Sequence, residues 1–173
     1  MSGDPVAAAQ WRPMAEDDLP AVLAVAERVH PDFPEDEAVF AERLALYPAG
    51  CHVLANGAGI GGYLIFHPWQ GEAPPALNTC LGALPRPASA YYLHDLAILP
   101  GLRKAGAGGA ALSMLMAHAA RMGLGTVRLV AVGGSAPFWR RHGFLPVGTP
   151  ELAGKLASYG ADAQLMALSL ERR

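Results

Sequence analysis

The chain has 173 residues, enough for one domain with a substantial core and too few for two domains of ordinary size. Hydrophobic residues make up 52% of it, yet no stretch approaches the roughly 20 uncharged residues of a membrane span. The net charge of −2 is small, and the N-terminal segment has no basic stretch leading into an apolar one, so we expect a cytoplasmic protein without a membrane partner.

Two amphipathic helices are predicted at the start of the chain. Residues 14–30 have acidic residues in the first turn and apolar residues at helical spacing, and Pro31 ends the pattern. Residues 34–48 show a second apolar face that includes Val39, Phe40 and Leu44. The first third of the chain is therefore expected to be mainly helical.

A hairpin and a long loop follow. The pattern predicts strands over residues 51–55 and 59–67, joined by a tight turn at Asn56 and Gly57. The proline-rich residues 71–90 have no clear period, and a loop of this length inside a compact domain is usually functional or disordered. Its three leucines favour partial packing over disorder.

Strands and helices alternate in the second half of the chain. The predicted order is strand, helix, strand, helix, strand, strand, over residues 91–99, 104–123, 126–132, 135–143, 144–148 and 161–170. Because a strand, helix and strand over residues 91–132 form a βαβ unit, part of the sheet is expected to be parallel. The fold class is therefore α/β, in a single domain spanning residues 1–173.

The two cysteines predict neither a metal site nor a disulfide framework. Cys51 and Cys80 fit no spacing typical of metal ligands, and one pair of thiols does not make a scaffold. We expect both to be buried free thiols, and no metal cofactor.

Charge is unevenly distributed along the chain. No Asp or Glu occurs from Leu96 to Pro150, whereas this stretch holds six of the 13 basic residues. The rest holds 7 basic and 15 acidic residues, a balance of −8. This segregation favours one region that meets a polyanion and another that meets a cation. Basic runs with interleaved aromatic residues are missing, which argues against nucleic acid and for a small phosphorylated ligand.

The segment "LRKAGAGGAAL", residues 102–112, places Gly106, Gly108 and Gly109 where a helix should begin. Each glycine in a helix interior costs roughly 0.5–1 kcal/mol relative to alanine, but glycines also let backbone N–H groups approach an anion at a helix N-terminus. A P-loop is excluded because Ala107 and Gly108 stand where it needs lysine and a hydroxyl. A nicotinamide-dinucleotide fingerprint is formally met, but its acidic residue about 20 positions on is missing.

A third phosphate-binding pattern fits better. The stretch "LAILPGLRKAGAG" resembles the pyrophosphate loop of the GNAT superfamily of N-acetyltransferases, with Arg103, Gly106 and Gly108 at the three defining positions of [RQ]xxGx[GA]. The stretch "SAPFWRRHGF" resembles a later helix and strand of the family, and the element order over residues 14–170 is the family's order. The resemblance implies a mixed, centrally splayed sheet flanked by helices on both faces.

The resemblance also implies acetyl-CoA as cosubstrate. Its pantetheine arm is expected between strands 91–98 and 126–132, paired with the backbone of Leu96 and Ile98, with an N–H near Ile98 polarising the thioester carbonyl. The diphosphate is expected on the amides from Arg103 to Gly109, whose hydrogen bonds would offset the cost of the glycines. The implied cofactor residues are Leu96, Ala97, Ile98, Arg103, Lys104, Ala105, Gly106, Ala107, Gly108, Gly109, Ser135, Phe138, Trp139 and Arg141.

The implied reaction is direct attack of an amine on the thioester in a ternary complex. An amine with a pKa near 10 is protonated at neutral pH, so a base must accept its proton, and His94 and Asp95 are the candidates. Adjacent strand residues point to opposite faces, so both reach the cleft only if the strand bulges. A structural role for both, including support of the loop over residues 71–90, is the alternative.

The departing thiolate has no obvious acid. The family often places a tyrosine where this chain has Trp139, so either the thiolate leaves unassisted or another hydroxyl, Tyr159 or Tyr92, protonates it. For Tyr159 a role in packing or in lining the acceptor site is the alternative. A chain without the acid also fits a silent acyl-CoA sensor or scaffold domain.

The amine acceptor is predicted only as a class. Acidic residues near the first two helices suggest a cationic acceptor, although ordinary solvated faces explain the same residues. The long loop beside Trp69 would suit a lid over a small-molecule amine better than a groove for a peptide or protein amine. The lack of an extra cation favours acetyl over a longer acidic acyl group. Many relatives are dimers, which leaves a homodimer open.

Overall fold

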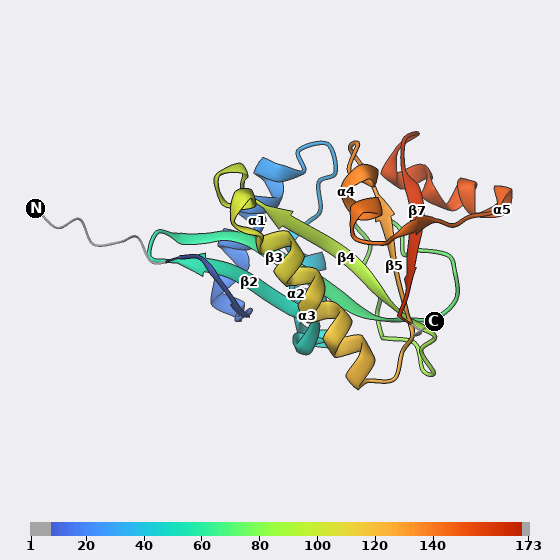
Figure 1. Cartoon of the computed structure of the whole chain (residues 1–173), viewed down its shortest axis with the longest axis horizontal. Coiled ribbons are helices and arrows are strands. Elements are labelled where there is room, and N and C mark those ends of the chain that lie inside the picture. Colours follow the sequence, from blue (N-terminus) through green and yellow to red (C-terminus); the bar gives the residue numbers. More distant parts are fainter. Residues whose placement is uncertain (1–7, 171–173) are drawn as a thin grey trace, which may run out of the picture.

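A seven-stranded mixed sheet forms the centre of the molecule (Figure 1) in the computed structural model, which describes residues 8–170. The order across the sheet is β1-β2-β3-β4-β5-β7-β6, and every neighbouring pair is antiparallel except β4 and β5. The strands are β1 (Gln10–Pro13), β2 (Cys51–Asn56), β3 (Gly59–Trp69), β4 (Ala90–Ile98), β5 (Thr126–Ala131), β6 (Leu145–Pro146) and β7 (Gln164–Ser169).

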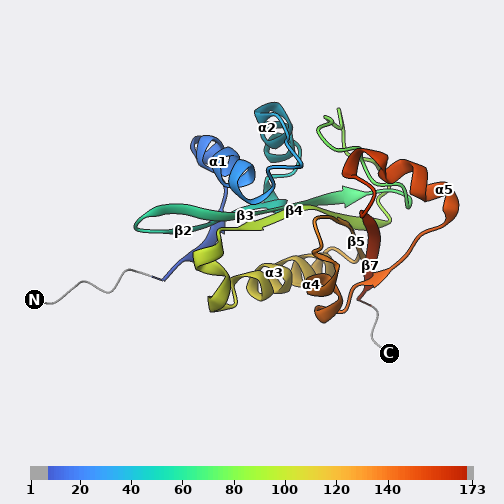
Figure 2. The same ribbon diagram turned by 90° about the horizontal axis from the view of Figure 1, so that it is seen from above.

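Helices cover both faces of this sheet (Figure 2). One face carries α1 (Leu19–Val29) and α2 (Glu37–Leu46), and the other carries α3 (Ala107–Arg121) and α4 (Ala136–Arg141). The last helix, α5 (Pro150–Ala153), runs into a 3-10 segment over Gly154–Tyr159. No helix within residues 8–170 is long and apolar enough to span a bilayer.

The two faces bury separate apolar clusters. On the α1 and α2 side, Val22 and Phe40 pack against Val53 and Tyr63 of the sheet. On the opposite side, Leu112 and Leu115 of α3 are among the residues packed with the inner strands. The predicted fold class is confirmed: a mixed sheet lies between two helical layers, with a parallel pair where the βαβ unit was expected.

Several local predictions were wrong. Strand β1 was missed because its four residues, "QWRP", show no alternation and gain their place only by pairing with β2. The helix expected from residue 104 begins at Ala107, because Gly106 adopts a left-handed conformation with φ of 75° after a 3-10 segment over Pro100–Ala105. Cys51 is a buried free thiol as expected, but Cys80 is exposed.

The first two helices are also shorter than predicted. The pattern from residue 14 begins instead with the 3-10 turn Glu16–Asp18, and α1 starts at Leu19. Residues 34–36 precede α2, whose first residue is Glu37, so Glu35 lies in the connection between the helices. The predicted hairpin is confirmed: β2 and β3 pair, and the Asn56 side chain accepts a hydrogen bond from the N–H of Ala58.

Strands β4 and β5 share only a short ladder before they diverge. Their register consists of Tyr91 opposite Val127 and Tyr92 opposite Arg128, although β4 continues to Ile98 and stays paired with β3. The remaining edge of β4 therefore faces away from any strand of residues 8–170. The central splay expected from the resemblance is present at the carboxyl ends of the two parallel strands.

A β-bulge lies within this diverging part of β4. Asp95 is opposite Ile65 and Leu93 is opposite Phe66, so His94 is the extra residue without a partner on β3. Such a bulge interrupts the alternation of side chains and increases the local twist. The side chains of His94 and Asp95 consequently both lie on the α1 and α2 side of the sheet, where each contacts a residue of the α1–α2 connection.

Removing the buried side chain of Leu115 is expected to destabilise the whole sheet-and-helix sandwich. Leu115 is fully buried in the α3-side cluster, so Leu115→Ala should lower the free energy of unfolding by about 2–5 kcal/mol. Met122, 60% exposed just beyond the end of the same helix, is the matched control, and Met122→Ala should cost less than about 0.5 kcal/mol. Urea unfolding followed by circular dichroism measures both; equal losses would contradict the described core.

Candidate active site

A cavity opens where β4 and β5 diverge. Its walls are largely apolar, with Leu93 and Leu96 from β4, Leu129 and Val130 from β5, and Trp139 from α4 among them. The polar groups are concentrated in a few side chains, which are His30, Glu35, His94, Asp95, Ser135 and Tyr159. An apolar cleft with a few convergent polar groups is the usual form of a small-molecule site.

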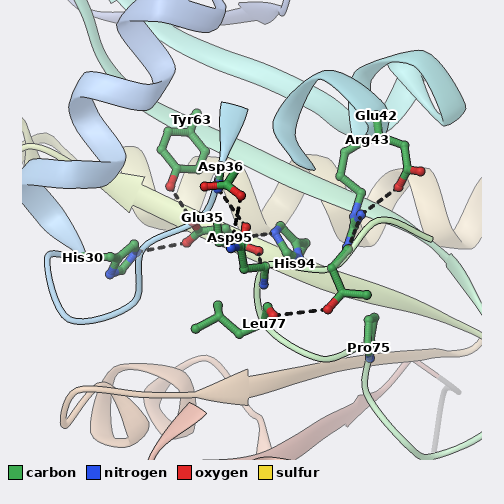
Figure 3. A network of polar contacts seen from close by, with 12 residues as sticks. His30, Glu35, Asp36, Glu42, Arg43, Tyr63, Pro75, Leu77, His94 and Asp95 are labelled. Atoms are coloured by element: carbon green, nitrogen blue, oxygen red, sulfur yellow. Dashed lines mark hydrogen bonds and ion pairs between the residues drawn. The ribbon is translucent and has the colours of Figure 1, made fainter. Parts of the chain in front are cut away.

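Two carboxylate–histidine pairs stand together at one side of this cavity (Figure 3). The Nε2 atom of His94 lies 2.8 Å from Oε1 of Glu35, and Nε2 of His30 lies 2.9 Å from Oδ1 of Asp95. Tyr63 donates its hydroxyl to the other carboxylate oxygen of Asp95. The bulge in β4 is what brings both pairs to the same face.

Asp95 favours the protonated form of the neighbouring His30 ring. Burial by itself would lower the pKa of His30, but the hydrogen bond and the charge of Asp95 outweigh burial and raise this pKa above 6.5. Burial likewise acts to raise the pKa of Asp95, and the contacts with His30 outweigh it, so this pKa is lowered. Asp95 is therefore a carboxylate at neutral pH, and His30 binds a proton more readily than an isolated histidine.

Beyond the short ladder, the edge of β4 that faces β5 has backbone groups that pair with no strand of residues 8–170. The N–H of Leu99 donates to the carbonyl of Gly61, on the side of β3. Because successive residues of a strand turn their backbone groups to alternate edges, Leu96 and Ile98 face the opposite edge, from which β5 has departed. Ala97 turns toward Tyr63 of β3, so its backbone is not on the open edge.

The glycine-rich turn stands at the end of this open edge. Gly106 is the left-handed N-cap of α3, so the amides of Ala107, Gly108 and Gly109 head a 15-residue helix, where no preceding carbonyl can accept them. A Cβ on Gly108 would lie 3.2 Å from the ring of Phe138, so a side chain here would press against helix α4. These amides and the helix dipole form an electropositive site.

Cations flank these amides. The Nε atom of Arg103 donates to the carbonyl of Ile98 at 2.8 Å, which fixes the guanidinium beside the open edge of β4. Lys104 and Ala105 are exposed on the same 3-10 segment. Of the α4 residues predicted to contact a cofactor, Trp139 lines the cavity and Arg141 is exposed and does not. Trp139 donates its indole N–H to the hydroxyl of Ser135, 3.2 Å away.

The long loop over residues 70–89 is held against the cavity by side chains from three directions. The carboxylate of Glu42 accepts the N–H groups of Leu81 and Gly82, and the Arg43 guanidinium donates to the carbonyl of Thr79 at 3.1 Å. Glu35 accepts the N–H of Asn78 at 3.0 Å with the carboxylate oxygen that His94 does not use. The loop is ordered and packed, as its leucines predicted.

The hydroxyl of Tyr159 takes part in the same attachment. It donates to the carbonyl of Pro75 at 2.7 Å and lies 3.4 Å from the hydroxyl of Tyr92. Burial raises the pKa of Tyr159 to about 12, and Tyr92 is also buried. Both hydroxyls thus stay protonated at neutral pH, and that of Tyr159 is already committed to the loop.

Comparison with known families agrees with this geometry. The model of the acetyltransferase (GNAT) family matches residues 11–144, which is more than half of the chain. The chain belongs to the GNAT family. Among curated proteins none matches the sequence significantly.

Solved GNAT structures share the fold at low sequence identity. The loading GNAT-like domain of CurA from Lyngbya majuscula is 16% identical with a TM-score of 0.76, over 95% of this chain and 99% of that one. The GNAT-like decarboxylase GphF, in complex with isobutyryl-CoA, is 21% identical with a TM-score of 0.75, over 94% and 100%. The ribosomal-protein-S18-alanine N-acetyltransferase of Escherichia coli is 19% identical with a TM-score of 0.66, over 95% and 96%.

Three residues of the candidate site were not predicted as catalytic from the sequence, although Glu35 was among the acidic residues noted near the first two helices. His30 and Glu35 lie in the connection between α1 and α2, and Tyr63 lies on β3, so each is far along the chain from its partner on β4. The only available signal was positional, since a connection between helices that cover one face of a sheet crosses the sheet near a strand end. That signal indicates which segment lies near the site but does not identify a residue in it.

Loss of the Glu42 charge is expected to loosen the loop. Glu42→Gln keeps the size of the side chain but removes its negative charge and one of its two acceptor oxygens. The amides of Leu81 and Gly82 should therefore exchange with solvent at least about tenfold faster. Glu37→Gln, in the exposed first turn of the same helix, should leave both rates unchanged. Hydrogen exchange measured by NMR compares them.

The same contact predicts a dependence on pH. Burial acts to raise the pKa of Glu42, but the amide and Arg43 contacts outweigh it and lower this pKa below 4.5. A lowered pKa in the folded state means that the contacts are complete above pH 4.5 and are lost as the pH falls through the lowered value. Protection of Leu81 and Gly82 should therefore fall in this acidic range in the unmodified chain; constant protection would contradict the described role of Glu42.

Proposed function

We propose that the chain is an acetyl-CoA-dependent N-acetyltransferase that acts on a primary amine. The observation that carries this proposal is the open edge of β4, which ends at the amides of the glycine-rich turn and borders a cavity containing two carboxylate–histidine pairs. Membership of the GNAT family supports it, and GphF, which shares the fold, was crystallised with isobutyryl-CoA.

The cosubstrate is assigned to the edge of β4 and to the start of α3. The N–H groups of Leu96 and Ile98 would donate to the pantetheine arm, as those of a neighbouring strand would, while the carbonyl of Ile98 keeps its contact with Arg103. The amides of Ala107, Gly108 and Gly109 would bind the diphosphate, with Arg103 and Lys104 supplying opposite charge. The open N–H near Ile98 would stabilise the charge that develops on the thioester oxygen.

Proton removal is assigned to the cluster on the α1 and α2 side. An amine with a pKa near 10 reaches the cavity as an ammonium and must lose a proton before its nitrogen can attack. The pairs His94–Glu35 and His30–Asp95 both border the cavity and are the groups placed to accept that proton. His94 and Asp95, the two candidate bases expected from the sequence, thus each belong to one of these pairs.

We assign Tyr159 a lining role and not that of a general acid. Its hydroxyl proton is donated to Pro75, and its pKa of about 12 makes it a weak donor to a thiolate with a pKa near 8.5. The thiolate is stable enough at that pKa to leave without an acid. Trp139, at the position where the family often has a tyrosine, forms part of the cavity wall.

The acceptor is proposed to be a small-molecule amine before a peptide amine. The loop over residues 70–89 is attached to Glu35, Glu42, Arg43 and Tyr159, and its Leu77 lines the cavity, so the loop would act as a wall that favours a small acceptor over an extended chain.

Binding of coenzyme A is expected to depend on Arg103. A charge-assisted hydrogen bond contributes about 1.5–3 kcal/mol, so Arg103→Ala should weaken binding about 10- to 150-fold. Arg121→Ala removes the same charge from the last turn of α3, at the far end of the helix, and should change binding less than about twofold. Isothermal titration calorimetry with coenzyme A measures both, and no heat with the unmodified chain would overturn the proposed cofactor site.

Turnover separates the transferase from a silent binding domain. Acetyl-CoA and a panel of polyamines, amino acids, aminoglycosides and peptides should release free thiol with at least one small amine, in step with acetylated product by mass spectrometry. Coenzyme A binding without turnover of any amine would indicate a sensor or scaffold, and activity on peptides alone would contradict the assignment of the loop as a closed wall.

A further inference from the structure

We propose that His30 is the group that accepts the proton of the ammonium, and that Asp95 is a positioning residue that holds and charges the His30 ring. This inference rests on the proposed transferase function and chooses between the two carboxylate–histidine pairs. The notable feature is that the base would come from the connection after α1 and not from the central strand.

Access to the cavity distinguishes the two histidines. Both side chains line the cavity, but that of His30 is 25% exposed whereas that of His94 is 2% exposed. A base must touch the incoming ammonium and afterwards release the proton to solvent. His30 meets both requirements, and His94 is enclosed between Glu35 and the strand.

The Asp95 carboxylate is itself fixed by a hydrogen bond from Tyr63, on the side away from His30. Tyr63 donates to one oxygen of Asp95 while the other oxygen lies 2.9 Å from Nε2 of His30, so the carboxylate has a fixed orientation. A carboxylate fixed in this way orients the neighbouring imidazole and stabilises its protonated form. The order Tyr63, Asp95, His30 therefore leads from the core to the cavity.

The charges that face His30 act in opposite directions. Asp95 and the backbone carbonyl of Leu96 favour the protonated ring, while burial and the charge of Arg103 oppose it. The balance raises the pKa of His30 above 6.5. A base works best when its pKa lies near the working pH, so this shift suits proton transfer at neutral pH.

The bulge also sets the direction of approach. Leu93 and Leu96 point into the α3-side core, whereas His94 and Asp95 point to the α1 and α2 side, so amine and cosubstrate would meet from opposite sides of β4.

One ammonium proton passes to His30, and the nitrogen lone pair forms the C–N bond. The C–S bond breaks, its electrons leave with sulfur, and the thiolate takes the second proton released by nitrogen.

The test compares pH profiles of turnover. In the unmodified chain kcat should decrease as the pH falls below the pKa of His30, because the protonated ring cannot accept a proton. This pKa is well below that of the amine, so the two titrations can be separated. His30→Gln should lower kcat about 100-fold or more and abolish this acidic limb, with the KM for acetyl-CoA unchanged. Asp32→Asn, at an exposed position in the same connection, is the matched control and should leave the profile unchanged.

Asp95→Asn tests the positioning role. The variant keeps a hydrogen-bonding group but loses the charge, so the acidic limb should move to lower pH. Independently of turnover, NMR titration of the His30 ring should give a pKa above 6.5 in the unmodified chain and a lower one in Asp95→Asn. A His30 pKa that Asp95→Asn leaves unchanged would overturn the positioning role.

The outcomes separate this inference from the proposed function. If His94→Gln abolishes the acidic limb and His30→Gln retains it, His30 is not the base, although the transferase function stands. If His30→Gln retains both rate and limb, the assignment is likewise overturned. If the unmodified chain neither binds coenzyme A nor acetylates any amine, the transferase function and the role of His30 fall together.

Discussion

The early end of the β4–β5 ladder is the constraint on which the site depends. Two register pairs hold the strands together at Tyr91 and Tyr92, and beyond them β4 follows β3 while β5 follows β7. A buried backbone group left unpaired costs about 1–3 kcal/mol, so folded proteins seldom leave a central strand edge open. The same divergence creates the cavity between the strands and turns Leu96 and Ile98 toward it. One departure from sheet regularity thus produces both the open strand edge and the cavity.

The bulge at His94 links this divergence to the chemistry. In a regular strand His94 and Asp95 would point to opposite faces, and one of them would enter the apolar core beneath α3. The extra residue puts both on one face, where each acid of the cluster has an imidazole neighbour. Burial of charge is costly unless the charge is paired and hydrogen-bonded. Glu35 and Tyr63 therefore matter to the fold as well as to the site.

The sequence predicted the elements that local patterns encode and missed those that depend on distant partners. Turn residues and alternation located the hairpin, and a local motif located the glycine-rich turn, while the parallel pair followed from the general rule for a strand–helix–strand connection. Strand β1 could not be found, since residues 10–13 form a strand only through β2, some 40 positions later. The bulge was the stated condition for two cleft residues, but no local signal required it. His94 and Glu35 are 59 positions apart, so their contact followed only from the assembled fold.

The glycines of the glycine-rich turn are explained in part by packing and backbone conformation, without a ligand. Hydrogen bonds to a diphosphate were expected to offset the cost of three glycines. Two of them already suit the unliganded fold: Gly106 has a φ of 75°, and a Cβ on Gly108 would press against Phe138. Packing of α4 on α3 and the sharp entry into α3 thus hold the amides in place before any anion arrives, and Arg103 is fixed by Ile98 beside them. A site whose donors are fixed by folding loses little conformational entropy on binding, so the contacts that shape this turn would also favour the anion proposed for it.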